Sequence, residues 1–252
     1  MAYSFRQTDI LALARQEGKV TVEDLAERFS VSLQTIRRDL TELAESGQLE
    51  RVHGGAMLPS GVSNIGYEDR RDLHSEAKGD IATRCAEAIP NDCSVFLNIG
   101  TTTEAVARAL LRHRNLMVIT NNINVANILV ANPDCEILVA GGKLRRSDGG
   151  LVGALTSRVI EQFKVDHAVI GCSALDLDGD LLDFDIQEVS VSKSILQQAR
   201  STFLVADASK FQRTAPVRIA SLSEIDTFFT DHPLPHALAS RCADWGTRVS
   251  LH

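Results

Sequence analysis

The sequence of 252 residues lacks any long apolar run, although 44% of its residues are hydrophobic. No stretch approaches the roughly 18 consecutive apolar residues of a transmembrane helix. The first residues, Met1 to Arg6, also lack the apolar core of a signal peptide. These absences argue against a membrane protein and predict a cytoplasmic location.

Paired cysteines are missing as well. The five cysteines are an odd number, lie far apart and form no C-x-x-C pair: Cys85, Cys93, Cys135, Cys172 and Cys242. This pattern argues against a disulfide framework and against a zinc site. We therefore expect no metal and no cofactor, and we expect most of these cysteines to be small core residues.

An excess of positive charge is also absent, since the net charge is −7. Residues 1–60 contain seven Lys and Arg against nine Asp and Glu. The position of the charges matters more than their sum, because screening limits each one to about 10 Å. Arg37, Arg38, Arg51 and His53 are expected on one side of the N-terminal region. The low positive charge predicts weak nonspecific affinity for DNA, but it does not exclude specific binding.

An amphipathic helix is present near the N-terminus. Ile36, Leu40 and Leu43 follow the i, i+4, i+7 spacing of a buried stripe. Ser32 occupies the N-cap position, where its hydroxyl can accept from the N–H of Thr35. The opposite face is polar and basic, as suits a DNA major groove. The residues predicted to lie at the DNA are Ser32, Gln34, Thr35, Arg37 and Arg38, with Arg51, His53, Gly54 and Gly55 of the next segment.

The elements around this helix predict a winged helix-turn-helix. We expect a helix over 6–17, a short strand at 19–21, a second helix after Thr21, and a hairpin with a Gly-Gly reversal within 49–56. Gln34 and Arg38 are expected at base edges, while Arg37, Arg51 and the glycines are expected at phosphates or the minor groove. A three-helix packing module without a DNA role is the alternative.

The composition predicts two domains. Residues 1–57 form the DNA-binding domain, 58–75 are a linker richer in Pro, Gly and Ser, and 76–252 form an α/β domain. In the last region, buried strands are expected at 94–98, 116–120, 136–140, 168–171, 202–206 and 227–230. Helices are expected near 75–88, 103–112, 123–131, 154–163, 185–199 and 236–244. This alternation predicts a mostly parallel sheet covered on both faces.

Polar and small residues follow several of these strands, where ligands bind in open α/β sheets. Gly100 and three threonines lead directly into a helix and form a cradle for an anion such as phosphate. Helix capping explains the Gly-Thr motif equally well and explains either asparagine alone better, and Lys210 alone would more often be a surface residue. Together these strand ends predict a polar ligand. The residues concerned are Gly100, Thr101, Thr102, Thr103, Asn121, Asn122, Gly141, Gly142, Asp207 and Lys210. The acidic stretch 176–188 lacks the spacing of a calcium loop and is expected to be a solvated loop.

Segments 34–40, 53–56, 99–102, 120–121, 141–142 and 207–210 resemble, in this order, the DeoR-type bacterial transcriptional regulators. The resemblance covers nearly the whole chain. It implies a cytoplasmic repressor with a ribose-5-phosphate-isomerase-like effector domain, which binds double-stranded operator DNA as a homodimer or homotetramer and is released by a phosphorylated sugar or polyol.

Segments 104–107, 120–127, 148–150 and 182–185 resemble the branch of the family that controls the glycerol-3-phosphate regulon. The expected effector is therefore glycerol-3-phosphate, with Glu188 among the contacts to its hydroxyls. Another sugar phosphate is the alternative.

The isomerase-like fold raises the possibility of an enzyme. Segment 207–210 resembles part of an isomerase active site, and Glu188 lies near the position of the isomerase general base. However, the isomerase pattern Asp-Gly-Ala-Asp is replaced by Gly171, Cys172, Ser173 and Ala174. Proton transfer then lacks its carboxylate partners, so we expect no enzymatic activity.

Overall fold

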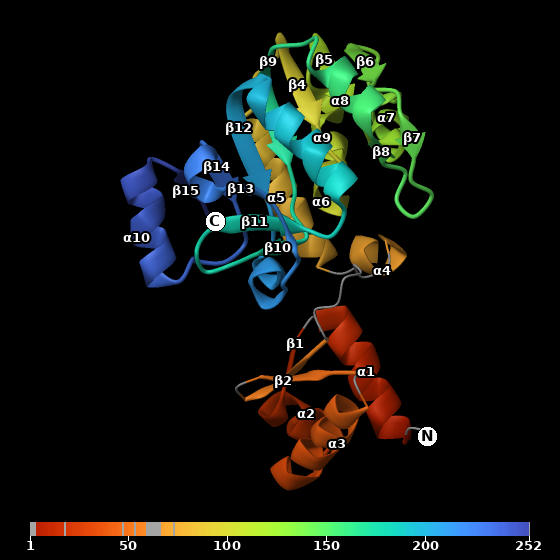
Figure 1. Cartoon of the computed structure of the whole chain (residues 1–252), viewed down its shortest axis with the longest axis vertical. Coiled ribbons are helices and arrows are strands. Elements are labelled where there is room, and N and C mark those ends of the chain that lie inside the picture. The colour runs from red at the N-terminus through yellow and green to blue at the C-terminus, as the bar shows by residue number, and fades with distance from the viewer. Residues whose placement is uncertain are drawn as a thin grey trace. The chain divides into compact units, whose positions relative to one another are not determined.

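The computed structural model describes residues 4–17, 19–46, 48–52, 54–58, 67–72 and 74–251. The chain divides into two compact units, residues 1–65 and 66–252 (Figure 1). None of the helices in the described ranges has the length and apolar character needed to span a membrane.

The N-terminal unit is a winged helix-turn-helix, as predicted. Its elements are α1 (Phe5–Glu17), β1 (Lys19–Thr21), α2 (Val22–Arg28), α3 (Leu33–Glu45), β2 (Glu50–Val52) and β3 (Gly55–Met57). The strands form an antiparallel sheet in the order β1-β3-β2. Ile10, Leu25, Ile36 and Leu40 belong to the apolar core that holds the helices and the sheet together.

The C-terminal unit is built around a seven-stranded sheet in the order β15-β14-β12-β9-β4-β5-β6, in which every pairing is parallel. These strands are β4 (Cys93–Leu97), β5 (Leu116–Thr120), β6 (Cys135–Val139), β9 (Val165–Ile170), β12 (Ala199–Val205), β14 (Thr227–Phe229) and β15 (Arg248–Ser250). The chain runs outward from β4 to β6 and, in the other direction, from β9 to β15. The direction therefore reverses between β4 and β9, and such a switch point is where open α/β sheets bind ligands.

Helices cover both faces of this sheet. They are α4 (Tyr67–Asp72), α5 (Ser75–Glu87), α6 (Thr101–Ala109), α7 (Ile123–Leu129), α8 (Ala154–Ile160), α9 (Ile186–Gln197) and α10 (His236–Trp245), with 3-10 helices η1 (Leu110–Arg112), η2 (Ala208–Gln212) and η3 (Leu222–Glu224). Alternate residues of β4 face opposite sides, so Val95 and Leu97 join the core under α5, α6 and α7, whereas Phe96 joins the core under α8, α9 and α10. The predicted parallel sheet, covered on both faces, is confirmed.

Short antiparallel strands complete the unit. They are β7 (Lys143–Leu144), β8 (Leu151–Val152), β10 (Ala174–Leu175), β11 (Asp180–Asp183) and β13 (Val217–Ser221). The sequence analysis missed these strands, as well as β15. The prediction that 176–188 is a solvated loop is wrong, because β11 pairs with β10 and β13. Asp183 and Glu188 are in consequence only 5% and 9% exposed.

Helix α4 forms within the predicted linker, whose residues 59–66 lie outside the described residues. A helix of six residues is too short to be stable alone. Contacts with the rest of the C-terminal unit hold it: the Tyr67 hydroxyl donates to the Glu104 carboxylate at 2.9 Å, and Asn124 Nδ2 donates to the Tyr67 hydroxyl at 3.0 Å.

Candidate DNA-binding surface and effector site

Helix α3 has the predicted cap and buried stripe. The Ser32 hydroxyl accepts from the Thr35 N–H at 3.2 Å. Ile36, Leu40 and Leu43 are completely buried. Gln34, Arg37 and Arg38 are exposed, whereas Thr35 is half-buried and hydrogen-bonds Ser32 through its hydroxyl. The polar face of α3 is therefore available to a partner, and its capped first turn is rigid.

Two arginines at α3, Arg38 and Arg6, are paired with carboxylates. Arg38 Nε donates to Glu42 Oε1 at 2.9 Å, and Gln7 Nε2 donates to Glu42 Oε2 at 2.7 Å. These two hydrogen bonds, that of Arg38 first, lower the pKa of Glu42. Arg6 Nε donates to Asp39 Oδ2 at 2.6 Å and thereby ties α1 to α3. The paired carboxylates offset the positive charge that α3 presents.

Gly54 and Gly55, at the turn between β2 and β3 that forms the wing, have different roles. Gly54 has φ +77°, is exposed and has open space around it, so it serves the turn. Gly55 is buried, and a Cβ atom there would lie 1.9 Å from the carbonyl oxygen of Val20. Its burial against β1 argues against the predicted DNA contact, because close strand packing explains this glycine. Arg51 is exposed on β2, and His53 lies outside the described residues.

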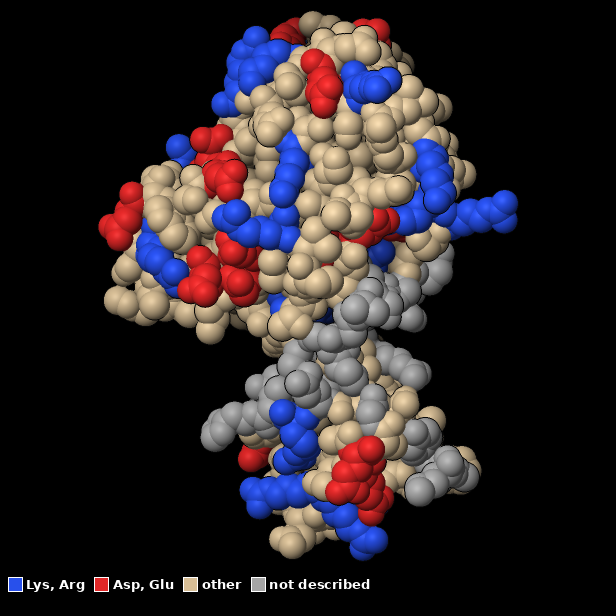
Figure 2. Space-filling view, in the orientation of Figure 1, with Lys and Arg blue, Asp and Glu red and all other residues tan. Residues whose placement is uncertain are grey.

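The face shown in Figure 2 carries Lys and Arg side chains interspersed with Asp and Glu, in both units. This mixture agrees with the net charge of −7. DNA affinity must then come from specific placement of a few cations and not from a broad positive field.

The switch point of the large sheet presents the start of α6. Gly100 precedes it with φ +149°, and the first N–H groups of a helix have no partner within the helix. Thr101 and Thr102 are 8% and 6% exposed, and their hydroxyls have no hydrogen-bond partner among the described residues. This turn therefore offers several donors to an anion.

Four cations gather around Asp207, and we refer to Arg70, Lys78, Lys210 and Arg213 as the cationic cluster. All three guanidinium nitrogens of Arg213 are buried without a hydrogen-bond partner among the described residues. Burial, together with the charges of Lys210, Arg70 and Arg213, lowers the pKa of Lys78 to about 8, while Asp207 opposes this effect. The cluster thus contains more buried positive charge than its carboxylate balances.

Asp207 remains ionised within this cluster. Burial acts to raise its pKa, but Lys210, the Ser209 hydroxyl and Lys78 lower it below its ordinary value. It also caps η2 by accepting from the Ser209 N–H at 3.1 Å. The pKa of Lys210 is lowered by burial and by Arg213, against the pull of Asp207.

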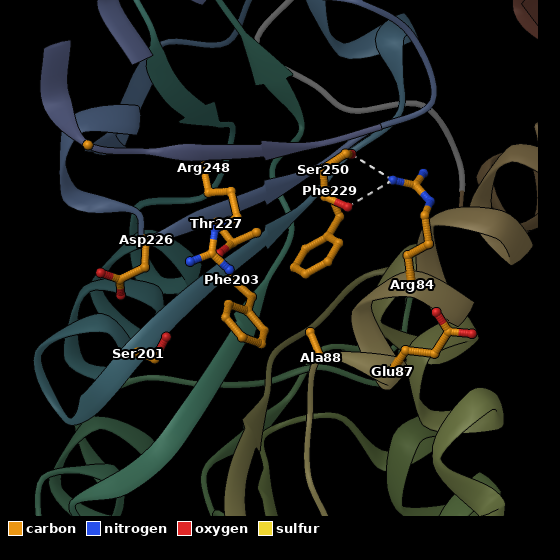
Figure 3. A pocket seen from close by; sticks show the side chains of 11 residues that line it. Arg84, Glu87, Ala88, Ser201, Phe203, Asp226, Thr227, Phe229, Arg248 and Ser250 are labelled. Carbon is orange, nitrogen blue, oxygen red and sulfur yellow. Dashed lines mark hydrogen bonds between the residues drawn. The ribbon is translucent and has the colours of Figure 1, made fainter. Parts of the chain in front are cut away.

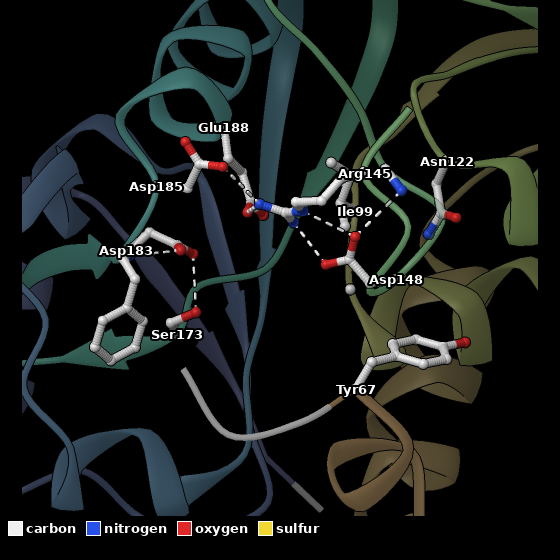
Figure 4. Close-up of polar contacts among 12 residues, drawn as sticks. Tyr67, Ile99, Asn122, Arg145, Asp148, Ser173, Asp183, Asp185 and Glu188 are labelled. Carbon is white, nitrogen blue, oxygen red and sulfur yellow. Dashed lines mark hydrogen bonds and ion pairs between the residues drawn. The ribbon is translucent and has the colours of Figure 1, made fainter. Parts of the chain in front are cut away.

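A second group of charges, the Arg145 cluster, lies between the β7–β8 hairpin and α9 (Figure 4). Arg145 contacts Asp148 at 2.6 Å, Glu188 at 2.6 Å and Asp185 at 3.1 Å. Burial and repulsion by Asp183 raise the pKa of Glu188 to about 7, although Arg145 opposes them. In contrast to Arg213, Arg145 is fully supplied with acceptors.

Other predicted ligand residues have structural roles within the fold. The Thr103 hydroxyl donates to the carbonyl oxygens of Asn98 and Gly100 at 2.8 and 2.7 Å. Asn122 is completely buried and caps α7 by accepting from the Asn124 N–H at 2.9 Å. Thr103 and Asn122 thus have hydrogen-bond partners within the fold, and their contact with an effector stays a prediction.

Gly141 and Gly142 lie apart from the cationic cluster. They follow β6, four strands from β12, a separation of about 19 Å at the usual strand spacing. A Cβ atom on Gly142 would lie 2.0 Å from Thr156 Oγ1, so close packing explains this glycine. Asn121 is also buried, and it donates to the Leu151 carbonyl at 3.1 Å.

The sequence analysis missed several charged residues of the site: Arg70, Lys78, Arg145, Asp148 and Arg213. Lys78 did carry a signal, because it precedes Ile81, Ala82 and Cys85 at i+3, i+4 and i+7 and is thus a lysine in an apolar stripe. The Arg145–Glu188 pair had no comparable signal, since its members are distant in sequence.

Another pocket, of about 630 Å³, lies between α5 and strands β12, β14 and β15 (Figure 3). Arg84 borders it and donates to the Ser250 and Thr230 carbonyls at 2.6 and 2.7 Å. Ser201, Thr227 and Arg248 line it near the starts of their strands. Its lining includes no residue of the cationic cluster and none of the turn at Gly100.

The fold and the site together define a winged helix-turn-helix regulator with an anion-sensing domain. A family model described as the DeoR-like helix-turn-helix domain matches residues 6–62, and one described as the DeoR C terminal sensor domain matches residues 73–232. The chain belongs to the DeoR family of transcriptional regulators. This membership makes it a DNA-binding regulator and not an isomerase.

Two relatives match over nearly their whole length. The chain is 46% identical to the glycerol-3-phosphate regulon repressor of Escherichia coli K12 over 100% of both sequences. It is 44% identical to the repressor of the same name from Haemophilus influenzae, over 100% of this chain and 98% of the relative. Among solved structures, a ribose 5-phosphate isomerase from Plasmodium falciparum is similar at 12% identity and a TM-score of 0.40, over 54% of this chain and 52% of that one.

Proposed function

We propose that this chain represses genes of glycerol and glycerol-3-phosphate metabolism and that glycerol-3-phosphate releases it from operator DNA. The names of the relatives at 46% and 44% identity support the choice of regulon. Another phosphorylated sugar or polyol as effector is the alternative.

The observation that carries the effector half of this proposal is the unpartnered guanidinium of Arg213. A buried cation without acceptors is costly, and a phosphate supplies several charged acceptors at once. The phosphate would lie between the start of α6 and the side chains of Lys78, Lys210 and Arg213. Thr101 and Lys78 line one pocket of about 430 Å³, which supports a shared role.

The glycerol part would be recognised by carboxylates. Asp207 is an ionised acceptor within the cationic cluster. Glu188, with a pKa of about 7, changes between hydrogen-bond donor and acceptor near neutral pH. The hydroxyl groups of glycerol-3-phosphate suit both the protonated and the ionised form of Glu188, since each hydroxyl donates one hydrogen bond and accepts others.

On DNA, α3 would enter the major groove. Gln34 and Arg38 suit adenine and guanine edges, whereas Arg37 and Arg51 suit phosphates. One short helix rarely provides enough affinity alone, so a homodimer or homotetramer on repeated half-sites is part of the proposal. The effector must bind the DNA-incompetent form more tightly, because equal affinity for both forms shifts nothing.

The decisive experiment titrates the operator-bound protein with glycerol-3-phosphate and follows release by fluorescence anisotropy. Glycerol, inorganic phosphate and ribose 5-phosphate serve as matched comparisons. We expect release by glycerol-3-phosphate at the lowest concentration. Release only by another sugar phosphate would establish the alternative effector, and release by none of these compounds would contradict a phosphate-sensing repressor.

A further inference from the structure

Helix α4 is bound to the sensor unit by groups that border the proposed phosphate site. Lys78 Nζ donates to the Arg70 carbonyl oxygen, so a member of the cationic cluster holds the α4 backbone directly. The Tyr67 hydroxyl donates to Glu104 on α6, the helix whose first turn forms the anion cradle. Residues 67–72 also come soon after the DNA-binding unit in the sequence.

Within α4, Arg70 lies between groups of opposite charge. Its Nη2 is 3.6 Å from Asp148 Oδ2, beyond hydrogen-bonding distance. Asp148 already accepts two hydrogen bonds from Arg145, at 2.9 and 2.6 Å. The Arg70 Nε is buried and has no acceptor among the described residues. Its present contact with Asp148 is thus loose, and a better acceptor would attract it.

Arg70 also interacts electrostatically with the remaining cations of the cluster. Its charge contributes to the lowered pKa values of Lys78, Lys210 and Arg213. Without an anion these groups repel Arg70. A bound phosphate dianion would reverse the sign of this interaction, because it attracts all four cations together.

We infer that Arg70 couples effector occupancy to α4 by exchanging its loose contact with Asp148 for a charge-assisted hydrogen bond to the bound phosphate. This inference rests on the proposed function and adds the route of regulation to it. Because Arg70 is anchored on α4, its movement displaces the helix. The displacement moves the first helix of the C-terminal unit, which follows the DNA-binding unit in the sequence. A two-state element biased by the ligand is what allosteric coupling requires.

The test separates effector binding from effector response. Arg70→Gln removes the charge while keeping a polar side chain, and Arg112→Gln removes an exposed arginine charge of η1, outside the pocket that Thr101 and Lys78 line, as a matched control. Glycerol-3-phosphate affinity is measured by calorimetry on DNA-free protein. Operator affinity is then measured by anisotropy, without effector and at saturating effector for each variant.

In the unmodified chain we expect saturating glycerol-3-phosphate to weaken operator binding by roughly 5–150-fold, the usual range of allosteric coupling. Arg70→Gln should bind the effector about tenfold more weakly, as expected for the loss of one charge-assisted hydrogen bond. At saturation its operator affinity should change by less than about twofold, well below that range. Arg112→Gln should resemble the unmodified chain in both measurements.

Full release of Arg70→Gln at saturating effector would overturn the role of Arg70, even if its effector affinity is reduced. If this variant does not fold, hydrogen exchange of the unmodified chain decides. We expect effector to change exchange in both α4 and the first turn of α6, and a change confined to α6 would contradict the inference. Failure of the unmodified chain to bind glycerol-3-phosphate is a separate outcome, which would reject the proposed function together with the role of Arg70.

Discussion

Two arginines of the DNA-binding unit and Arg213 of the sensor unit lie in opposite electrostatic surroundings. In the DNA-binding unit, Arg38 and Arg6 lie near the surface, and each contacts a carboxylate, at 2.9 and 2.6 Å respectively. In the sensor unit, Arg213 is buried with three unpartnered nitrogens beside Lys78 and Lys210. Arg38 and Arg6 are therefore neutralised where water could solvate them, whereas the guanidinium of Arg213 has no acceptor where water is excluded.

This difference follows from the two kinds of anion. DNA is a large polyanion that attracts exposed cations over a Debye length and displaces their weak surface partners. A single small phosphate has no such reach, so its site must hold desolvated donors in place before it arrives. On the proposed function, the unpaired buried charge of Arg213 would be the physical cause of phosphate affinity and a source of instability in the effector-free protein.

The largest effect is expected from Arg145→Met, which would leave Asp148 and Glu188 buried without their cation. Breaking a buried ion pair costs about 3–5 kcal/mol in the free energy of unfolding. Arg218→Met is the matched control, because Arg218 contacts Asp180 at 2.6 Å on the surface. There the loss should stay below about 1 kcal/mol. Urea unfolding followed by circular dichroism measures both variants, and equal losses would show that burial is not the cause.

Arg213→Met tests whether the unpartnered guanidinium of Arg213 destabilises the effector-free protein and binds the effector. Removing a buried cation without acceptors should stabilise the effector-free protein by about 1–3 kcal/mol. The same variant should lose the stabilisation that glycerol-3-phosphate gives the unmodified chain, about 2.7 kcal/mol at a ligand concentration of 100 Kd. Thermal unfolding with and without effector measures both effects. A less stable effector-free variant, or one still stabilised by effector, would contradict this account of Arg213.

Local patterns sufficed to predict much of this molecule. The stripe of Ile36, Leu40 and Leu43 and the cap at Ser32 depend on residues within one or two turns, so the recognition helix was predictable. The buried parallel strands were predictable for the same reason, since each is an apolar run between helical segments.

Pairings between distant residues were not predictable in this way. The antiparallel strands β10, β11 and β13 depend on tertiary pairing, and the Arg145–Glu188 contact joins residues 43 positions apart. At Thr103 and Asn122 the residue types were right for phosphate binding, but their polar groups are bonded within the fold. Sequence identifies a donor, whereas only the structure shows whether that donor is free.

Arg38→Ala tests whether the exposed cations read sequence. If Arg38 binds a guanine edge, its loss should cost about 1–3 kcal/mol of operator affinity and relax specificity at one base pair. Anisotropy measurements on operators with single base-pair substitutions distinguish a base contact from a phosphate contact. Equal weakening on every sequence would make Arg38 a phosphate contact.

The pH dependence of effector binding tests the buried cations without mutation. Lys78 has a pKa of about 8 in the effector-free protein, and a bound phosphate raises it, so binding takes up a proton above that pH. Glycerol-3-phosphate affinity should therefore fall as pH rises through about 8, by at most about tenfold per pH unit for one proton. Calorimetry across this range measures the slope. Lys78→Met should bind more weakly and flatten the profile, and an unchanged profile would reject Lys78 as its source.

The smallest effect is expected from Glu42→Gln, because Glu42 is a solvated partner that DNA can displace. Its carboxylate accepts from Arg38 and Gln7, so it both orients Arg38 and reduces the positive charge of α3. If charge reduction dominates, the variant should bind operator about twofold more tightly at low salt, as for a single exposed ion pair. The gain should vanish at high salt, where the charges are screened. Weaker binding at every salt concentration would instead mean that Glu42 positions Arg38 for the base, and the exposed pairs would then be part of the recognition surface.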